Sequence, residues 1–224
     1  MEKVKKHDFI EIDYIGKTKD DDVIFDTTNE KIAKQHNIYN QKATYKPIVI
    51  CVGERQIIKG LDNALIGKEV GKTYVIEIKP EDGFGHRDPK LVQLIQTSKF
   101  FKQNIVPVPG LQVNIDGIIG TIKSVGGGRT LVDFNHPLAG RELVYEVKIN
   151  KLIVNNKEKI KNFLKLETGV ELKNEDIDIE GNIALIKVRD LKLIKEDTKK
   201  RLKDILKLKE IKLINKNTKE NKKE

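Results

Sequence analysis

The residue types that most often carry catalysis are scarce and scattered in this sequence. Its 224 residues include a single cysteine, Cys51, and no Ser or Cys lies in a nucleophile motif. The four histidines lie far apart, at His7, His36, His86 and His136. None has a second ligand at metal-binding spacing, and GGGR at 126–129 lacks the flanks of a phosphate-binding loop. We therefore expect no metal and no cofactor, and a reaction that needs no nucleophile.

Rotation about the peptide bond before a proline is a reaction of this kind. Its barrier of about 18–20 kcal/mol comes from the double-bond character of the C–N bond. Twisting the amide removes that conjugation, and no bond is made or broken. A catalyst therefore needs an apolar, water-poor cradle for the proline ring and a few dipoles matched to the twisted carbonyl. Aromatic and aliphatic side chains can build such a cradle.

The aromatic and glycine-containing motifs follow one another in a specific order. A strand with Tyr14 and Gly16 precedes IFDTT, then VGERQIIKGLDNALIG and, a dozen or so residues later, PEDGFG. This order resembles the catalytic domain of FKBP-type peptidyl-prolyl cis–trans isomerases. The resemblance implies that activity, no cofactor, and a proline pocket. The implied pocket residues are Tyr14, Phe25, Asp26, Ile48, Ile57, Ile58, Leu61, Phe84 and Tyr145.

The resemblance also implies a role for each residue. The catalytic set would be Tyr14, Asp26, Ile58, Phe84 and Tyr145. Asp26 would orient Tyr14 and polarise the site without acting as a base, and the backbone N–H of Ile58 would donate to a substrate carbonyl. Leu61 would form the pocket floor, where many family members have Trp. Phe84 stands where the family often has Tyr, so one hydroxyl donor is lost.

A second motif, FNHPLAGREL at 134–143, resembles one in the SlyD-like branch of the family. There it directly precedes the last strand of the catalytic domain. Leu138 would then cap the pocket, and His136 would arrange the turn or contact the substrate. The implied substrate-binding set becomes Phe25, Ile48, Ile57, Leu61, His136 and Leu138.

Between these two motifs the sequence changes character. Short strands separated by Gly and Pro are typical of a small β-rich module. In the SlyD-like branch an insertion at this place binds unfolded chains and delivers prolines to the pocket. The residues that would form this chaperone surface are Leu91, Leu94, Ile95, Phe100, Phe101 and Val108. Part of this apolar stretch must form the core of so small a module, and the rest would be exposed for binding.

Hydrophobic periodicity predicts the scaffold that positions these residues. The expected strands are 7–15, 47–53, 72–80 and 141–153. Residues 57–66 suit a short helix, and 29–46 a long surface loop with about one helical turn. The last strand resumes the earlier pattern, which predicts a catalytic domain of 1–85 and 133–154 interrupted by an inserted domain at 86–132. The fold class is α+β, with an FKBP-like antiparallel sheet wrapped on a short helix.

A third region, 155–224, has the pattern of a small α+β domain. The expected elements are a helix at 157–169 ending at Gly169, a hairpin around 180–182, an amphipathic helix at 196–209, a strand at 210–214 and a disordered basic end. This region resembles the extra C-terminal domain of long archaeal family members. It lacks the His/Cys-rich tail of bacterial relatives, so nickel binding is not expected. The amphipathic helix would pack internally, form a homodimer or meet a ribosomal or client partner.

Composition places the chain among soluble proteins. Hydrophobic residues make up 38% and charged residues 34%, and no apolar run approaches the roughly 20 residues that span a bilayer. The charged, strand-like start and the lone Cys51, which we expect to be buried, favour the cytoplasm. The abundance of Lys, Glu and Ile is typical of proteins adapted to heat. Of the net charge of +9, about +8 lies from Lys187 onward. This basic region would either contact nucleic acid or the ribosome, or form a solvated helix surface.

Three functions remain open from the sequence. The first is a peptidyl-prolyl isomerase with chaperone activity, whose partners are unfolded or proline-containing polypeptides. The second is a holdase chaperone with weak isomerase activity, suggested by Leu61 and Phe84. The third is a ribosome- or nucleic-acid-associated adaptor, suggested by the basic C-terminal region, although the absence of aromatic residues in 187–224 argues against base stacking.

Overall fold

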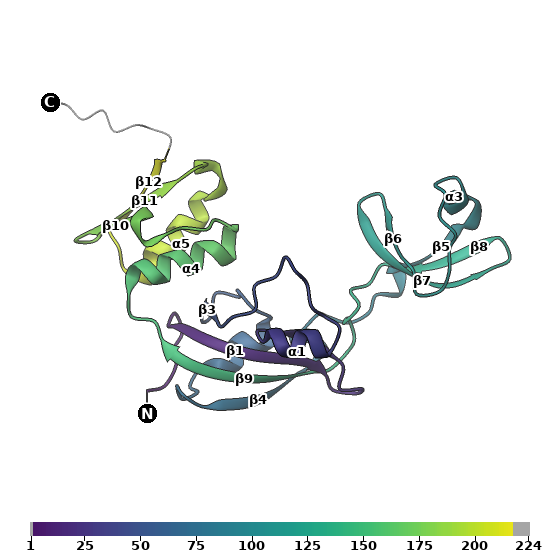
Figure 1. Ribbon diagram of the computed structural model, residues 1–224, viewed down its shortest axis with the longest axis horizontal. Helices are drawn as coiled ribbons and strands as arrows, with labels where there is room; N and C mark the ends of the chain where they lie inside the picture. Colours follow the sequence, from purple (N-terminus) through teal and green to yellow (C-terminus); the bar gives the residue numbers. More distant parts are fainter. Residues whose placement is uncertain (1, 217–224) are drawn as a thin grey trace. The chain divides into compact units, whose positions relative to one another are not determined.

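The computed structural model describes residues 2–216 of the chain. They form two compact units (Figure 1): one runs to Ile78 and resumes at Leu143, and the other spans Lys79–Glu142. The predicted limits of the insertion, 86 and 132, lie inside the second unit. The division into three domains stays a prediction.

A five-stranded antiparallel sheet is the centre of the first unit. Its strands are β1 (Phe9–Thr18), β2 (Ile24–Thr27), β3 (Ile48–Cys51), β4 (Thr73–Ile78) and β9 (Leu143–Leu152). The order is β2-β1-β9-β4, and β3 shares with β2 the outer edge of β1. The mixed α+β class and the antiparallel sheet predicted from the sequence are confirmed.

Strand β9 shows why the sequence forms this sheet. Its buried residues alternate with more exposed ones, as a strand with one covered face requires. The buried set is Leu143, Tyr145, Val147 and Ile149. Strand β9 lies between β1 and β4, so residues from far along the chain complete the sheet that the N-terminal segment begins.

Two short helices precede β4. Helix α1 (Glu30–Gln35) begins after Asn29, whose side chain accepts hydrogen bonds from two amides of the first turn. It is slightly longer than the single turn expected in this polar segment. Helix α2 (Lys59–Leu65), predicted from its apolar face, buries Leu61 and Leu65.

The second unit is a four-stranded antiparallel sheet with one short helix (Figure 1). Its elements are β5 (Val92–Gln96), α3 (Thr97–Phe101), β6 (Gln112–Ile115), β7 (Ile118–Gly126) and β8 (Arg129–Asp133), in the sheet order β5-β8-β7-β6. Its small core consists of Phe100, Val113, Ile122 and Val132. The GGGR segment forms the hairpin turn between β7 and β8, where Gly127 and Gly128 have positive φ.

The C-terminal part of the first unit follows the predicted order. It contains α4 (Asn156–Thr168), β10 (Ile177–Glu180), β11 (Ile183–Val188), α5 (Glu196–Leu206) and β12 (Glu210–Asn215). Gly169 ends α4 in the left-handed conformation, as expected. Strand β12 pairs parallel to β11, a pairing that the sequence did not predict. Short 3-10 turns occur here at Asn174–Asp176 and Leu191–Leu193, and in the second unit at Pro80–Asp82 and Pro89–Leu91. The predicted disordered end lies mostly outside the described residues.

These C-terminal elements share one hydrophobic core with the first sheet. Phe9 of β1 and Cys51 of β3 pack in the same buried cluster as Phe163 of α4 and Leu202 of α5. The apolar face of α5 is therefore covered within the chain, which is the first of the three roles considered for it; the homodimer and the ribosomal contact stay predictions. Cys51 is buried as predicted, and burial raises the pKa of its thiol. In the described part of the chain, no helix combines the length and apolarity needed to cross a membrane.

Candidate functional site

Four of the predicted pocket residues meet where β1, β2 and β9 run side by side. The hydroxyl of Tyr14 donates a hydrogen bond to Asp26 Oδ2 at 2.9 Å. The ring of Tyr145 lies 5.9 Å from that of Tyr14 and 5.8 Å from that of Phe25, measured between centroids. Burial raises the pKa of both tyrosine hydroxyls, and the charge of Asp26 raises it further, so both stay protonated near neutral pH.

Gly16 makes room for this aromatic cluster. A Cβ atom at this position would lie 2.9 Å from Cε1 of Tyr145 and 3.1 Å from Cζ of Phe25. Any side chain here would therefore displace one of the rings. A glycine inside an alternating strand was the signal for such a close approach.

The turn between β3 and α2 carries the next group of predicted residues. Ile57 and Ile58 are half-buried at the start of α2, and Leu61 is fully buried one turn later. Asp62, which the sequence analysis missed, is 1% exposed and accepts hydrogen bonds from the amides of residues 53 and 55, at 2.8 and 2.9 Å. Its signal was a carboxylate on the apolar face of a predicted helix. Ile48, half-buried, begins β3.

The remaining predicted site residues belong to the second unit. The rings of Phe84 and His136 stack with their centroids 4.3 Å apart and an interplanar angle of 4°. His136 Nδ1 accepts a hydrogen bond from the amide of Leu138 at 3.2 Å, so this histidine shapes the turn before β9. Leu138 itself is half-buried.

The two chain segments that enter and leave the second unit are bound together. Asp88 and Asn135 exchange two hydrogen bonds: the Asp88 amide donates to Asn135 Oδ1 at 2.8 Å, and Asn135 Nδ2 donates to the Asp88 carbonyl at 3.0 Å. Arg87 forms an ion pair with the buried carboxylate of Asp133. The sequence did not predict these contacts. They show that Asn135, near the start of the FNHPLAG motif, joins the segment that leaves the second unit to the segment that enters it.

The predicted chaperone surface is only partly exposed. Leu91, Leu94, Phe101 and Val108 are exposed, and Ile95 is half-buried. Phe100 was wrongly assigned to this surface: it is only 3% exposed and forms the core with β6, β7 and β8. Adjacent residues of a short helix point in different directions, so only one of the two phenylalanines can face the sheet.

Exposed apolar residues that the sequence analysis did not single out lie near the β6–β7 hairpin of the same unit. Ile118 and Ile119 are 59% and 64% exposed, although both are β-branched residues of a strand. Val106, in the segment between α3 and β6, is also exposed. A glycine followed by two isoleucines at a hairpin start was the available signal.

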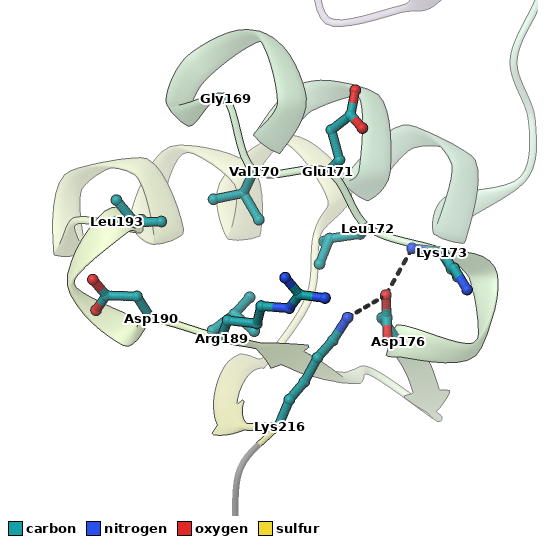
Figure 2. Close-up of a pocket in the computed structure, with 11 residues that line it drawn as sticks. Gly169, Val170, Glu171, Leu172, Lys173, Asp176, Arg189, Asp190, Leu193 and Lys216 are labelled. Carbon is teal, nitrogen blue, oxygen red and sulfur yellow. Dashed lines mark hydrogen bonds and ion pairs between the residues drawn. The ribbon is translucent and has the colours of Figure 1, made fainter.

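A cavity of about 510 Å³ lies in the C-terminal part of the first unit (Figure 2). Asp176 forms an ion pair with Lys216 at 2.7 Å and accepts a hydrogen bond from the Lys173 amide at 2.7 Å. The residues that line the cavity include three with positive and three with negative side chains, so their formal charges cancel. None of the predicted proline-pocket residues lines this cavity, so it is separate from the site above.

Comparison with known proteins identifies the family. The family model for FKBP-type peptidyl-prolyl cis–trans isomerase matches residues 1–105. A short-type peptidyl-prolyl cis–trans isomerase of Methanocaldococcus jannaschii is 37% identical over 146 residues, covering 65% of this chain and 92% of the relative. The chain belongs to the FKBP-type peptidyl-prolyl isomerase family. The family and enzyme class predicted from the sequence are therefore confirmed.

Other FKBP-type relatives support the assignment to SlyD-like proteins. SlyD of Haemophilus influenzae is 30% identical over 151 residues, covering 66% of this chain and 71% of the relative. A probable FKBP-type 16 kDa isomerase of Pseudomonas fluorescens is 34% identical over 108 residues, covering 46% and 71%. A model described as FKBP26, IF domain, matches residues 93–138, within the second unit of this FKBP-type isomerase.

Proposed function

We propose that this FKBP-type isomerase accelerates proline-limited protein folding and captures unfolded chains through its second unit. The observation that carries the catalytic part is the aromatic cluster in which Asp26 holds the Tyr14 hydroxyl. Such a site offers an apolar wall and a fixed polar group with no nucleophile, and rotation about a prolyl bond needs nothing more.

The chemistry follows from the groups in the cluster. An X–Pro amide loses conjugation as it twists, and its charge separation falls, so an apolar and water-poor site favours the twisted form over the planar one. Phe25 and Tyr145 would supply that wall, with Leu61 beneath the proline ring. Because the Tyr14 hydroxyl donates its proton to Asp26, the Tyr14 oxygen would be available to a substrate only as an acceptor. The backbone N–H of Ile58 would donate to a substrate carbonyl.

The exposed apolar side chains of the second unit support the capture of unfolded chains. Leu94, Phe101, Val108, Ile118 and Ile119 are all exposed on a unit whose core is only a handful of residues. Apolar exposure of this kind is costly in a monomeric soluble protein unless a partner uses it. Weak binding at this surface would raise the local concentration of prolyl substrate at the first unit.

A proline-limited refolding assay tests both parts. The intact protein should accelerate the slow phase catalytically, and a variant with residues 86–132 replaced by a short linker should retain activity on a proline tetrapeptide while losing most activity on a refolding protein. If the intact protein leaves both substrates unchanged, the isomerase assignment fails. Equal activity of both forms on the refolding protein would remove the chaperone role.

A holdase with weak isomerase activity is the second candidate. It is favoured by Leu61 and Phe84, which depart from the family residues at the floor and the wall. In that case unfolded clients would bind and stay soluble while the slow refolding phase is accelerated only slightly. Substitutions in the aromatic cluster would then leave client protection unchanged.

A further inference from the structure

The turn that carries Ile57 and Ile58, two residues predicted to line the proline pocket, is bound by a residue 147 positions after Glu54 in the chain. Arg201 of α5 donates from Nε and Nη2 to Glu54 Oε2, at 3.0 and 2.7 Å. Its Nη2 also lies 3.3 Å from the backbone carbonyl of Glu54. Helix α5 therefore contacts both the side chain and the backbone of the turn between β3 and α2.

A second path links Arg201 to the same turn through α4. Arg201 Nη1 donates to Glu167 Oε2 at 2.8 Å, and Glu167 Oε1 accepts from Gln56 Nε2 at 3.2 Å. Gln56 Oε1 in turn accepts from the amide of Cys51 at 2.8 Å, which connects the turn to the end of β3. The turn is thus bound at Glu54 and at Gln56, on both sides of Arg55.

The environment makes these contacts stronger than ordinary surface ion pairs. The side chains of Glu54 and Glu167 are only 12% and 17% exposed, and that of Arg201 is 33% exposed. The guanidinium also lies over the ring of Phe163, 5.6 Å from its centroid. Without Arg201, two poorly solvated carboxylates would lose their shared counter-charge, so the turn would have to move or open.

We propose that Arg201 is a positioning residue for the isomerase site. In this proposal the C-terminal part of the first unit holds the 53–58 turn in the geometry that presents Ile57 and Ile58 to a prolyl substrate. The inference rests on the proposed function for the role of those two isoleucines, but the structural link itself does not. It assigns to the C-terminal region a function in catalysis.

The test compares Arg201→Ala with Lys200→Ala in the full-length protein. Lys200 is the exposed neighbour on the same helix, so this control loses one positive charge without touching the turn. For Arg201→Ala we expect kcat/KM on a proline tetrapeptide to fall about tenfold, mainly through a higher KM, because small displacements of binding groups have effects of this order. Lys200→Ala should keep the activity of the unaltered protein, and Arg201→Lys should recover part of the loss.

Hydrogen exchange separates positioning from general stability. The amides of Gly53 and Arg55 donate to Asp62, so they report directly on opening of the turn. They should exchange about tenfold faster in Arg201→Ala, while amides of β9 remain unchanged. If Arg201→Ala does not fold, Glu167→Gln provides the same measurements, because it replaces one carboxylate of the network with a neutral amide of the same shape.

The outcomes distinguish this proposal from the proposed function. Unchanged turn exchange and unchanged kcat/KM in Arg201→Ala would overturn the positioning role and leave the isomerase assignment intact. An unaltered protein without isomerase activity would remove the proposed function, and the exchange measurement would still decide whether Arg201 holds the turn. Loss of β9 protection together with the turn would show a purely structural role and would also overturn the proposal.

Discussion

The Tyr14–Asp26 hydrogen bond is a contact between a shielded hydroxyl and a carboxylate at the edge of the sheet. A hydrogen bond to a charged group contributes about 1.5–3 kcal/mol, roughly a factor of ten or more in an equilibrium or rate constant. Asp26 is itself exposed, so its removal should not damage the core. Its loss should instead free the Tyr14 ring and hydroxyl to leave the orientation that the proline pocket requires.

We therefore predict that Asp26→Ala and Tyr14→Phe each lower kcat/KM about tenfold in a tetrapeptide assay. Because both substitutions break the same hydrogen bond, the double variant should be little worse than either single one. Thermal denaturation of each variant provides the control for folding. Losses that multiply to about a hundredfold would show that the two residues act independently.

The raised pKa values of Tyr14 and Tyr145 predict a pH dependence of stability. Burial favours the neutral hydroxyl in the folded state, whereas in the unfolded chain it ionises near pH 10. The stabilisation is thus complete below about pH 10 and is lost as the pH rises towards the folded-state pKa. The free energy of unfolding, measured in urea, should fall more steeply above pH 10 in the intact protein than in Tyr145→Phe. Parallel curves for the two proteins would contradict this account.

At the scale of the elements, helix α3 holds two adjacent phenylalanines with opposite environments. Phe100 packs in the core of the second unit, and Phe101 is 56% exposed. We predict that Phe100→Ala destabilises this unit by about 3–5 kcal/mol and that Phe101→Ala leaves its stability almost unchanged while weakening client binding several-fold. Urea unfolding and titration with a permanently unfolded protein measure the two effects. Equal client affinity for Phe101→Ala and the intact protein would exclude α3 from the binding surface.

The same helix shows how far the sequence could predict the elements. Alternation identified β1, β4 and β9, and helical spacing identified α2, α4 and α5, because each buries one face against a core. A five-residue helix is too short for its period to show which phenylalanine faces the sheet. Local patterns also do not predict the parallel pairing of β12 with β11, because that pairing depends on where α5 returns the chain.

In the candidate site, too, some residues were predicted from the sequence and others were not. Motif order was sufficient to bring Tyr14, Phe25, Asp26 and Tyr145 together as candidates, and the structure places them in contact. The supporting residues were missed. The position of Asp62 on a predicted helix was a signal, but no motif marks the backbone amides of the neighbouring turn that it binds. Arg201 acts across a separation of 147 residues, and such a contact depends on tertiary packing that local patterns do not predict.

At the scale of the whole molecule, the C-terminal region and the first sheet depend on one core. Phe9 and Cys51 contribute to the same buried cluster as α4 and α5, and each is 1% exposed or less. Removal of the C-terminal elements would expose this face of β1 and β3 to water. The C-terminal region from residue 155 therefore stabilises the first unit, and it is also a candidate for contacts with a partner.

Truncation after residue 154 tests this dependence through the chemistry of Cys51. In the intact protein the thiol is buried and its pKa is raised, so reaction with a thiol reagent at pH 8 should be slow. The truncated protein should react at least about tenfold faster and unfold at a lower temperature, because the cover over β3 is gone. Urea-unfolded protein gives the limiting rate for a free thiol. Since Cys51 precedes the 53–58 turn, a truncated chain that kept slow labelling would show that the sheet holds this region without α4 and α5.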